Sequence, residues 1–216
     1  MNPGHHPTDD LLVEHISGAS PAAVSLLVAT HLSLCSRCRR VASLLDAVGG
    51  AALNALPAQG APEQGLDAFL SRLDAPVEVG PPAPPAGPDW LPQPLRSLVG
   101  PLPDARWRTL VPGLAWNLDL PLHHGDRPVR LARMRAGFRV PRHSHAGREL
   151  NLVLAGGYTD ATGSFGRGDL ADNDGTVEHE LRIDAGEPCV LLVVNDAPLL
   201  PRGPVANVLS WMTGGF

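Results

Sequence analysis

The chain contains no lysine, and all 17 of its cationic side chains are arginine. Aromatic residues and cysteine are also scarce. Aromatic residues make up only 4% of the 216 positions, and there are only three cysteines. The absence of lysine excludes catalysis through a lysine Schiff base. Three cysteines are too few for a disulfide framework, and their odd number favours a reducing, cytoplasmic compartment over secretion.

Long apolar runs and a positive net charge are missing as well. The longest apolar stretches, such as residues 22–34 and 189–194, are shorter than the roughly 20 residues that a membrane-spanning helix needs. The first ten residues are polar and do not resemble a secretory signal. The net charge of −5 and the isoelectric point near 5.9 also argue against nonspecific nucleic-acid binding. We therefore predict a cytoplasmic protein with no membrane partner and no direct nucleic-acid partner.

Proline, by contrast, is abundant and unevenly distributed. Eight of the 23 prolines fall between Pro76 and Pro94, interleaved with glycine and alanine. Proline removes backbone donors and its small neighbours bury little, so this composition predicts an extended linker. The predicted organisation is therefore a first domain over residues 1–75, a linker over 76–94 and a second domain over 95–216, both domains being of ordinary size.

The segment before the linker has helical periodicity. Thr8 can cap a short helix that ends near Ser17, and Ser20 followed by Pro21 marks a second helix start. Two further helices are predicted from apolar stripes formed by Val41, Leu44, Leu45, Val48 and Ala52, and by Leu66, Phe69, Leu70 and Leu73. We expect the last stripe to pack in a core, with a partner-binding face as the alternative.

After the linker the apolar period changes to two. Residues 176–184 place Val177, His179, Leu181 and Ile183 on one face and charged residues on the other, which predicts a strand. Similar short runs recur between turn residues at 107–111, 129–134, 150–154, 189–194 and 208–212. Cys189 opens one of them and is expected to be a buried, inert thiol. The predicted fold class is therefore α + β multidomain: a small helical bundle followed by an all-β sandwich or barrel.

A first candidate metal site lies at the predicted junction between the second and third helices. His31, Cys35 and Cys38 form an H-x3-C-x2-C pattern, which offers three ligands of the kind that tetrahedral zinc binds. His5 and His6 are candidates for the fourth ligand. Structural zinc would stabilise a domain with a small core, by on the order of 10 kcal/mol. A redox-active thiol pair is the alternative.

The thiols of this first site lie in an electropositive part of the sequence. Cys35 would stand at a helix N-terminus, close to Arg37, Arg39 and Arg40. Helix dipole and arginine charges both favour a thiolate over a thiol. We therefore expect lowered thiol pKa values here.

A second candidate site lies in the β half. His143, His145 and Glu149 have the same parity, so their side chains would share one face of an extended chain. Two imidazoles and a carboxylate form a partial coordination sphere for a borderline divalent ion. His179, on the apolar side of its own strand, is the candidate fourth ligand.

The sequence motifs of the two candidate sites, taken together, resemble those of a known family. The pattern Gly137-x5-His143-x-His145-x3-Glu149-x6-Gly156 resembles the first cupin motif, and Gly168 with His179 resembles part of the second. A short helical domain with His5-His6-Pro7-Thr8-Asp9 and the H-x3-C-x2-C pattern, joined to a cupin, resembles the ChrR-type zinc-binding anti-sigma factors over nearly the whole chain.

The resemblance implies a fold, a ligand set and a partner. The implied fold is a zinc-stabilised helical domain followed by a cupin β-barrel. The implied function is that of a negative regulator, which sequesters an extracytoplasmic-function sigma factor and releases it on oxidative stress of the singlet-oxygen type. One zinc ion would be held by His6, His31, Cys35 and Cys38. A second would be held by His143, His145, Glu149 and His179.

Two other functions compete with this interpretation. A cupin dioxygenase or isomerase would use the second site with iron, manganese or nickel, and the zinc domain would then be an accessory module. A DNA-binding repressor would need a basic recognition helix, whereas the tight arginine cluster flanks the candidate thiolates. No general base for a particular substrate is evident beyond the candidate ligands, so we expect neither catalysis nor a small-molecule substrate.

Overall fold

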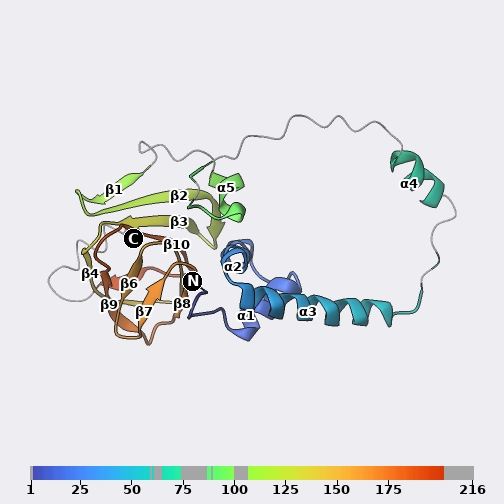
Figure 1. The fold of residues 1–216 in the computed structure, drawn as a ribbon, viewed down its shortest axis with the longest axis horizontal. Helices are drawn as coiled ribbons and strands as arrows, with labels where there is room; N and C mark the ends of the chain where they lie inside the picture. Colours follow the sequence, from blue (N-terminus) through green and yellow to red (C-terminus); the bar gives the residue numbers. More distant parts are fainter. Residues whose placement is uncertain are drawn as a thin grey trace.

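The computed structural model describes residues 2–58, 60, 65–73, 87–88, 90–99 and 107–201. Within these residues the helices come first and the strands follow, as predicted (Figure 1). The helices are α1 (Asp9–Ile16), α2 (Ala22–Leu34), α3 (Ser36–Asn54), α4 (Gly65–Leu73) and α5 (Gln93–Val99). The strands are β1 (Arg108–Val111), β2 (Ala115–His124), β3 (Arg127–Met134), β4 (Arg139–His145), β5 (Glu149–Ala155), β6 (Gly157–Thr159), β7 (Ser164–Gly166), β8 (Leu170–Asn173), β9 (Glu178–Ile183), β10 (Cys189–Asn195) and β11 (Leu199–Pro201). Among the described helices, none has the length and apolar character needed to cross a membrane.

Local capping explains where the first helices begin. The Thr8 side chain accepts a hydrogen bond from the backbone N–H of Leu11 at 3.4 Å, and two aspartates follow in the first turn of α1. Helix α3 begins after Cys35, whose Sγ accepts from the backbone N–H of Cys38 at 3.4 Å. This cap places both thiols at the junction between α2 and α3.

The β domain consists of two antiparallel sheets that lie against each other (Figure 1). One sheet has six strands in the order β1-β2-β3-β10-β5-β8, and the other has five in the order β11-β4-β9-β6-β7. A hydrophobic cluster that includes Val153, Tyr158, Leu181 and Leu191 fills the space between them. The alternating pattern predicted for residues 176–184 is confirmed in β9, where His179, Leu181 and Ile183 are buried. The predicted fold class, helices followed by an all-β part, is thus confirmed.

The helices share a second hydrophobic cluster with the other face of the six-stranded sheet. Leu27 and Val28 of α2 are fully buried in the same cluster as Leu118, Leu131 and Leu192 of β2, β3 and β10. The sheet is therefore buried on both faces, so β5 and β10 are buried along almost their whole length and β10 is a nearly continuous apolar run. The helical part and the β part form one packed body through this cluster.

The outer half of α3 and all of α4 depart from the predicted packing. Leu66, Phe69 and Leu73 of α4 are 57–64% exposed, and Leu44 and Val48 of α3 are each 68% exposed. Figure 1 shows α3 projecting from the body and α4 standing apart from it. The expectation that the stripe on α4 packs in a core is wrong for the described residues, and this stripe is an uncovered apolar face.

Part of the predicted linker lies outside the described residues, namely 76–86 and 89. At its end, Leu91 is buried, and α5 begins at Gln93 and adds buried Leu95 and Val99 to the cluster shared by helices and sheet. The predicted strand at 208–212 also lies outside the described residues.

Candidate metal centres

Two clusters of metal-ligating side chains are present in the described part of the chain. The first consists of His6, His31, Cys35 and Cys38, and the second of His143, His145, Glu149 and His179. In each cluster one ligand atom per residue lies within 4.8 Å of every other. The structure thus brings together the eight residues singled out from the sequence, in two groups of four.

The first cluster joins the N-terminal segment to the α2–α3 junction. His6 Nδ1 lies 3.5 Å from Cys35 Sγ and 3.4 Å from Cys38 Sγ. Tetrahedral zinc, with bonds of about 2.3 Å to sulfur and about 2.0 Å to nitrogen, separates its ligand atoms by about 3.5 Å. The spacing of these three side chains therefore fits a single tetrahedral ion.

His31 is oriented for the same centre by a residue of the β domain. Its Nδ1 lies 2.8 Å from the carbonyl oxygen of Gly168, to which it donates a hydrogen bond, and its Nε2 is buried without a partner. Burial lowers the pKa of His31 to about 4, so the ring is neutral near pH 7. A neutral imidazole with an unpartnered ring nitrogen facing two thiols is suited to bind a metal.

The pKa of Cys38 differs from the sequence-based expectation. Burial, together with the neighbouring Cys35, raises the pKa of the Cys38 thiol to about 12, and Arg37 only partly opposes this effect. The arginines and the helix N-terminus therefore do not suffice to lower the pKa of this thiol. A bound cation would supply the missing positive charge, because metal ions deprotonate the thiols that coordinate them.

The second cluster lies inside the β domain, where β4, β5 and β9 meet. His143 and His145 come from β4, and Glu149 opens β5. His179 lies on β9, where it pairs with His143 of the neighbouring β4. His145 Nε2 is 3.2 Å from His179 Nε2, and His145 Nδ1 is 3.6 Å from Glu149 Oε2. All four residues are buried, at 2–5% exposure.

Hydrogen bonds outside the second cluster fix the orientation of two of its histidine rings. His143 Nδ1 donates to the carbonyl oxygen of Pro141 at 2.8 Å, and His179 Nδ1 donates to Asp160 Oδ2 at 2.7 Å. Both rings therefore present Nε2 toward the cluster, an arrangement that is general for metal-binding histidines. Burial by itself would raise the pKa of Asp160, but the hydrogen bonds from Thr162 and His179 outweigh burial and lower this pKa. The carboxylate therefore stays ionised.

Burial sets the protonation of the second cluster in the absence of a cation. It lowers the pKa values of His143 and His145 to about 4 each and raises the pKa of Glu149 to about 7. Asn151 Nδ2 donates to Glu149 Oε2 at 2.7 Å and partly counteracts the latter shift. Neutral imidazoles beside a buried carboxyl group form a donor set that fits a divalent ion, because such an ion offsets the cost of burying the carboxylate.

A small cavity of about 90 Å³ adjoins the second cluster. His143 and Glu149 form part of its wall, together with Asn151, Asn195 and apolar side chains of both sheets. Its size corresponds to a few water-sized molecules. A small molecule therefore fits beside the cluster, and a larger pocket of about 490 Å³ is lined by His179 and Asp160.

The remaining candidates from the sequence lie outside both clusters. The ring of His5 stacks on Phe165 with centroids 4.2 Å apart, and His6 rather than His5 faces the thiols. Cys189 is fully buried, as expected. Sequence reasoning missed Asp160, and it named Gly168 as a motif residue without its contact to His31, because the contacts of Asp160 with His179 and of Gly168 with His31 join positions distant in the chain. The sequence Asp160-Ala161-Thr162-Gly163 is typical of a turn, but it does not indicate that Asp160 contacts His179.

The protein thus has the features of a metalloprotein with two candidate metal sites. One site, with two histidines and two cysteines, lies in a helical domain, and the other, with three histidines and a glutamate, lies in a cupin-like domain. Residues 96–199 match the family model described as the ChrR Cupin-like domain. The chain is 41% identical over 196 residues to the anti-sigma-E factor ChrR of Cereibacter sphaeroides, covering 90% of this chain and 91% of the relative.

A solved structure is similar over almost the same extent. The Rhodobacter sphaeroides SigE in complex with the anti-sigma ChrR matches with a TM-score of 0.77 and 37% identity, covering 89% of this chain and 98% of the matched chain. The chain therefore belongs to the ChrR family of anti-sigma factors.

Proposed function

We propose that the protein is a metal-dependent anti-sigma factor. It binds and sequesters an extracytoplasmic-function sigma factor, and it releases that factor on oxidative stress sensed with its cupin domain. The observation that supports this most strongly is the similarity to an anti-sigma factor over 90% of the chain, with both candidate metal clusters included in this structure.

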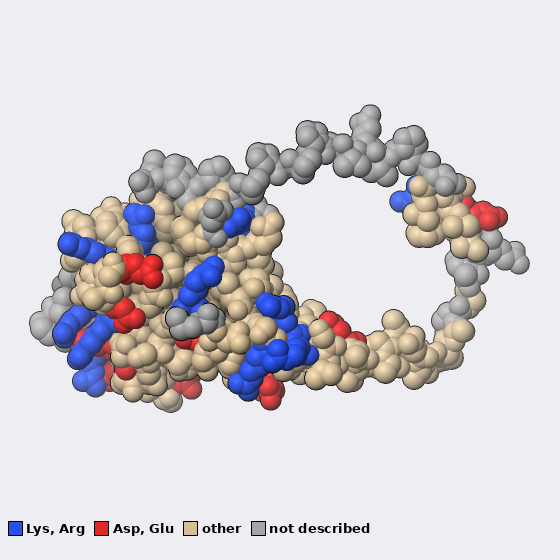
Figure 2. All heavy atoms as spheres, in the orientation of Figure 1, with Lys and Arg blue, Asp and Glu red and all other residues tan. Residues whose placement is uncertain are grey.

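The sigma-binding surface is assigned to the apolar faces of α3 and α4. The exposed side chains are Leu44, Val48 and Leu53 on α3, and Leu66, Phe69, Leu70 and Leu73 on α4. Figure 2 shows that the outer half of α3 is almost free of charged side chains. Apolar helical faces without a cover mark interaction sites, and amphipathic helices commonly bind partner proteins through them.

The first cluster would hold zinc as a structural ion. Four protein ligands form a closed site, which supplies folding energy and leaves no open position for catalysis. Through His6 on one side and Cys35 and Cys38 on the other, the ion would tie the N-terminal segment to the start of α3. The direction in which α3 projects, and hence the binding surface, would depend on this site.

The second cluster would hold the sensing metal through His143, His145, Glu149 and His179. A bound ion supplies a centre that a small oxidant can approach through the adjoining cavity of about 90 Å³. The similarity to an anti-sigma factor over 90% of the chain supports a sensor rather than a cupin enzyme acting on an organic substrate. We accordingly infer that the chain is not an enzyme and that it acts in the cytoplasm, where sigma factors are found.

Co-expression with the extracytoplasmic-function sigma factors of the same genome, followed by affinity capture and metal counting, tests the proposal. The unmodified chain should capture one of them. The paired changes Leu44→Ser with Val48→Ser should weaken capture at least tenfold, because each loses about 1.5 kcal/mol or more of apolar burial. Val13→Ser, at a 49% exposed position on α1, is the matched control and should bind normally. Failure of the unmodified chain to capture any of these factors would contradict the proposal.

A further inference from the structure

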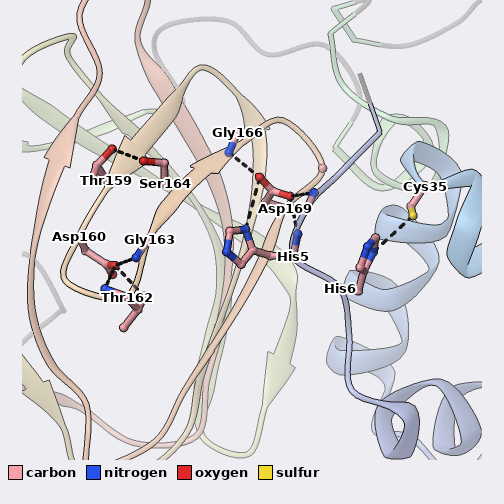
Figure 3. A network of polar contacts seen from close by, with 12 residues as sticks. His5, His6, Cys35, Thr159, Asp160, Thr162, Gly163, Ser164, Gly166 and Asp169 are labelled. Carbon is pink, nitrogen blue, oxygen red and sulfur yellow. Dashed lines mark hydrogen bonds and ion pairs between the residues drawn. The ribbon is translucent and has the colours of Figure 1, made fainter.

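The N-terminal strap, defined as residues 3–6, lies on the turn formed by residues 166–170 of the β domain (Figure 3). The backbone N–H groups of Gly4 and His5 donate to Asp169 Oδ1 at 2.6 and 2.8 Å, and Gly166 N–H donates to Asp169 Oδ2 at 2.7 Å. The carbonyl oxygen of His5 accepts from Leu170 N–H at 3.3 Å. One carboxylate therefore holds the strap and its own turn at the same time.

Side-chain packing seats the strap more firmly. The His5 ring stacks on Phe165, and Phe165 stacks on Tyr158 with centroids 4.9 Å apart. Gly168 has a φ of +92°, and a Cβ at that position would lie 2.6 Å from Pro3 Cγ. The close approach of the strap thus requires glycine at this position of the turn.

This turn orients two of the four residues of the first cluster. His6 directly follows His5, so its position is set by the hydrogen bonds of the strap to Asp169. His31 donates from Nδ1 to the carbonyl oxygen of Gly168 at 2.8 Å. The candidate zinc site of the helical domain therefore has its outer hydrogen-bond partners in the β domain.

The same stretch of chain also contacts the second cluster. Strands β6 and β7 form a hairpin in which Tyr158 pairs with Phe165. At the tip of this hairpin Asp160 accepts from His179 Nδ1 at 2.7 Å, and at its base the chain runs into the turn that holds the strap. Figure 3 shows the contacts of Asp160 and those of Asp169 as two separate groups, and the chain between these two residues connects them.

We propose that residues 158–170 are a coupling element between the two metal sites, with Asp169 and Asp160 as its positioning residues. The geometry of the cupin cluster, transmitted along this hairpin, sets how firmly the helical cluster holds its metal. This inference rests on the proposed function, because it assumes that both clusters bind metal. It gives the sensor a physical route to the sigma-binding helices that does not pass through the proline-rich segment.

Cobalt(II) substitution in the full chain distinguishes the two sites. Thiolate-to-cobalt charge-transfer absorption reports on the first cluster alone, since the second contains no sulfur. We expect Asp169→Ala to accelerate the loss of this absorption to a chelator about tenfold, the scale of outer-shell effects on metal sites. Asp169→Asn keeps an acceptor for the strap but not for Gly166, so its effect should be smaller. Asp126→Ala, at an exposed position of the β2–β3 turn, is the control.

A double-mutant cycle tests the coupling itself. His143→Ala, which disables the cupin cluster, should accelerate cobalt loss from the thiolate site several-fold in the unmodified background. In the Asp169→Ala background it should add no further acceleration, because the connection is already broken. Unchanged exchange in both Asp169 variants, or fully additive effects of His143→Ala and Asp169→Ala, would overturn the inference. If the unmodified chain never develops thiolate-to-cobalt absorption, the proposed metal site fails instead.

Discussion

His179 donates its Nδ1–H to Asp160 Oδ2 at 2.7 Å, with both side chains fully buried. The other carboxylate oxygen of Asp160 accepts from the backbone N–H and the hydroxyl of Thr162 at 2.8 and 2.6 Å. The carboxylate is thereby fixed by its own turn and in turn fixes the histidine ring. Because Nδ1 carries the proton, Nε2 of His179 is left free to face the cupin cluster.

Asp160→Asn should therefore weaken metal binding by the cupin cluster 10- to 100-fold. The asparagine oxygen would still accept the hydrogen bonds from Thr162, so its NH₂ group would face His179 Nδ1. Because an NH₂ group donates, the imidazole would have to move its proton from Nδ1 to Nε2. Asp174→Asn is a close control, because Asp174 accepts the same pair of hydrogen bonds from Thr176. Metal competition titrations measure the effect, and equal affinities for the two variants would contradict the assigned orientation.

Glu149→Gln should change how the stability of the metal-free protein depends on pH. Burial raises the pKa of Glu149 from 4.5 to about 7 in the folded state. The folded state therefore binds more protons than the unfolded state between these values, and the stability associated with Glu149 is complete below pH 4.5 and lost as the pH rises through 7.

The free energy of unfolding of Glu149→Gln should accordingly increase, relative to the parent, by about 3 kcal/mol between pH 4 and pH 8. The lowered pKa values of His143 and His145 act in the opposite direction, but they are common to both proteins and cancel in the difference. Urea unfolding after removal of metal by a chelator measures this difference in the free energy of unfolding, with Glu187→Gln at an exposed site as the control. A difference that does not vary with pH would exclude the raised pKa.

The core shared by helices and sheet predicts a common unfolding transition. Leu27→Ala in α2 should destabilise the protein by about 2–5 kcal/mol, since Leu27 is fully buried against the six-stranded sheet. The fluorescence of Trp107 and Trp116, which belong to the β part, should report the loss even though the change is in a helix. Leu44→Ala, at a 68% exposed position, should cost no more than about 0.5 kcal/mol. An unchanged tryptophan transition in Leu27→Ala would show that the two parts unfold independently.

The sequence predicted those elements whose signals are local. Thr8 and the aspartates after it define the start of α1, and the alternation around Leu181 defines β9, because capping and side-chain period depend on a few adjacent residues. Both ligand sets could also be named, since most of their members lie within seven residues of each other. The resemblance to a family added the pairing of His6 with the cysteines.

The packing partners of these elements could not be predicted in the same way. An apolar stripe such as Leu66, Phe69 and Leu73 is the same whether it faces a core or a partner protein, and only the tertiary structure shows it uncovered. Helix α2 is apolar on more than one face because it contacts both helices and the sheet, and periodicity does not identify what covers each face. The contact of His31 with Gly168 spans 137 residues and has no signature in the sequence.

The central claim is that a metal bound by the helical domain is required to hold the sigma factor. Affinity capture of the sigma factor by a Cys35→Ala, Cys38→Ala variant, with metal counted on the same sample, tests this claim most directly. The account predicts that the variant loses one metal equivalent, keeps the metal of the cupin cluster, and captures no sigma factor. Full capture by a variant whose helical site is free of metal would contradict it.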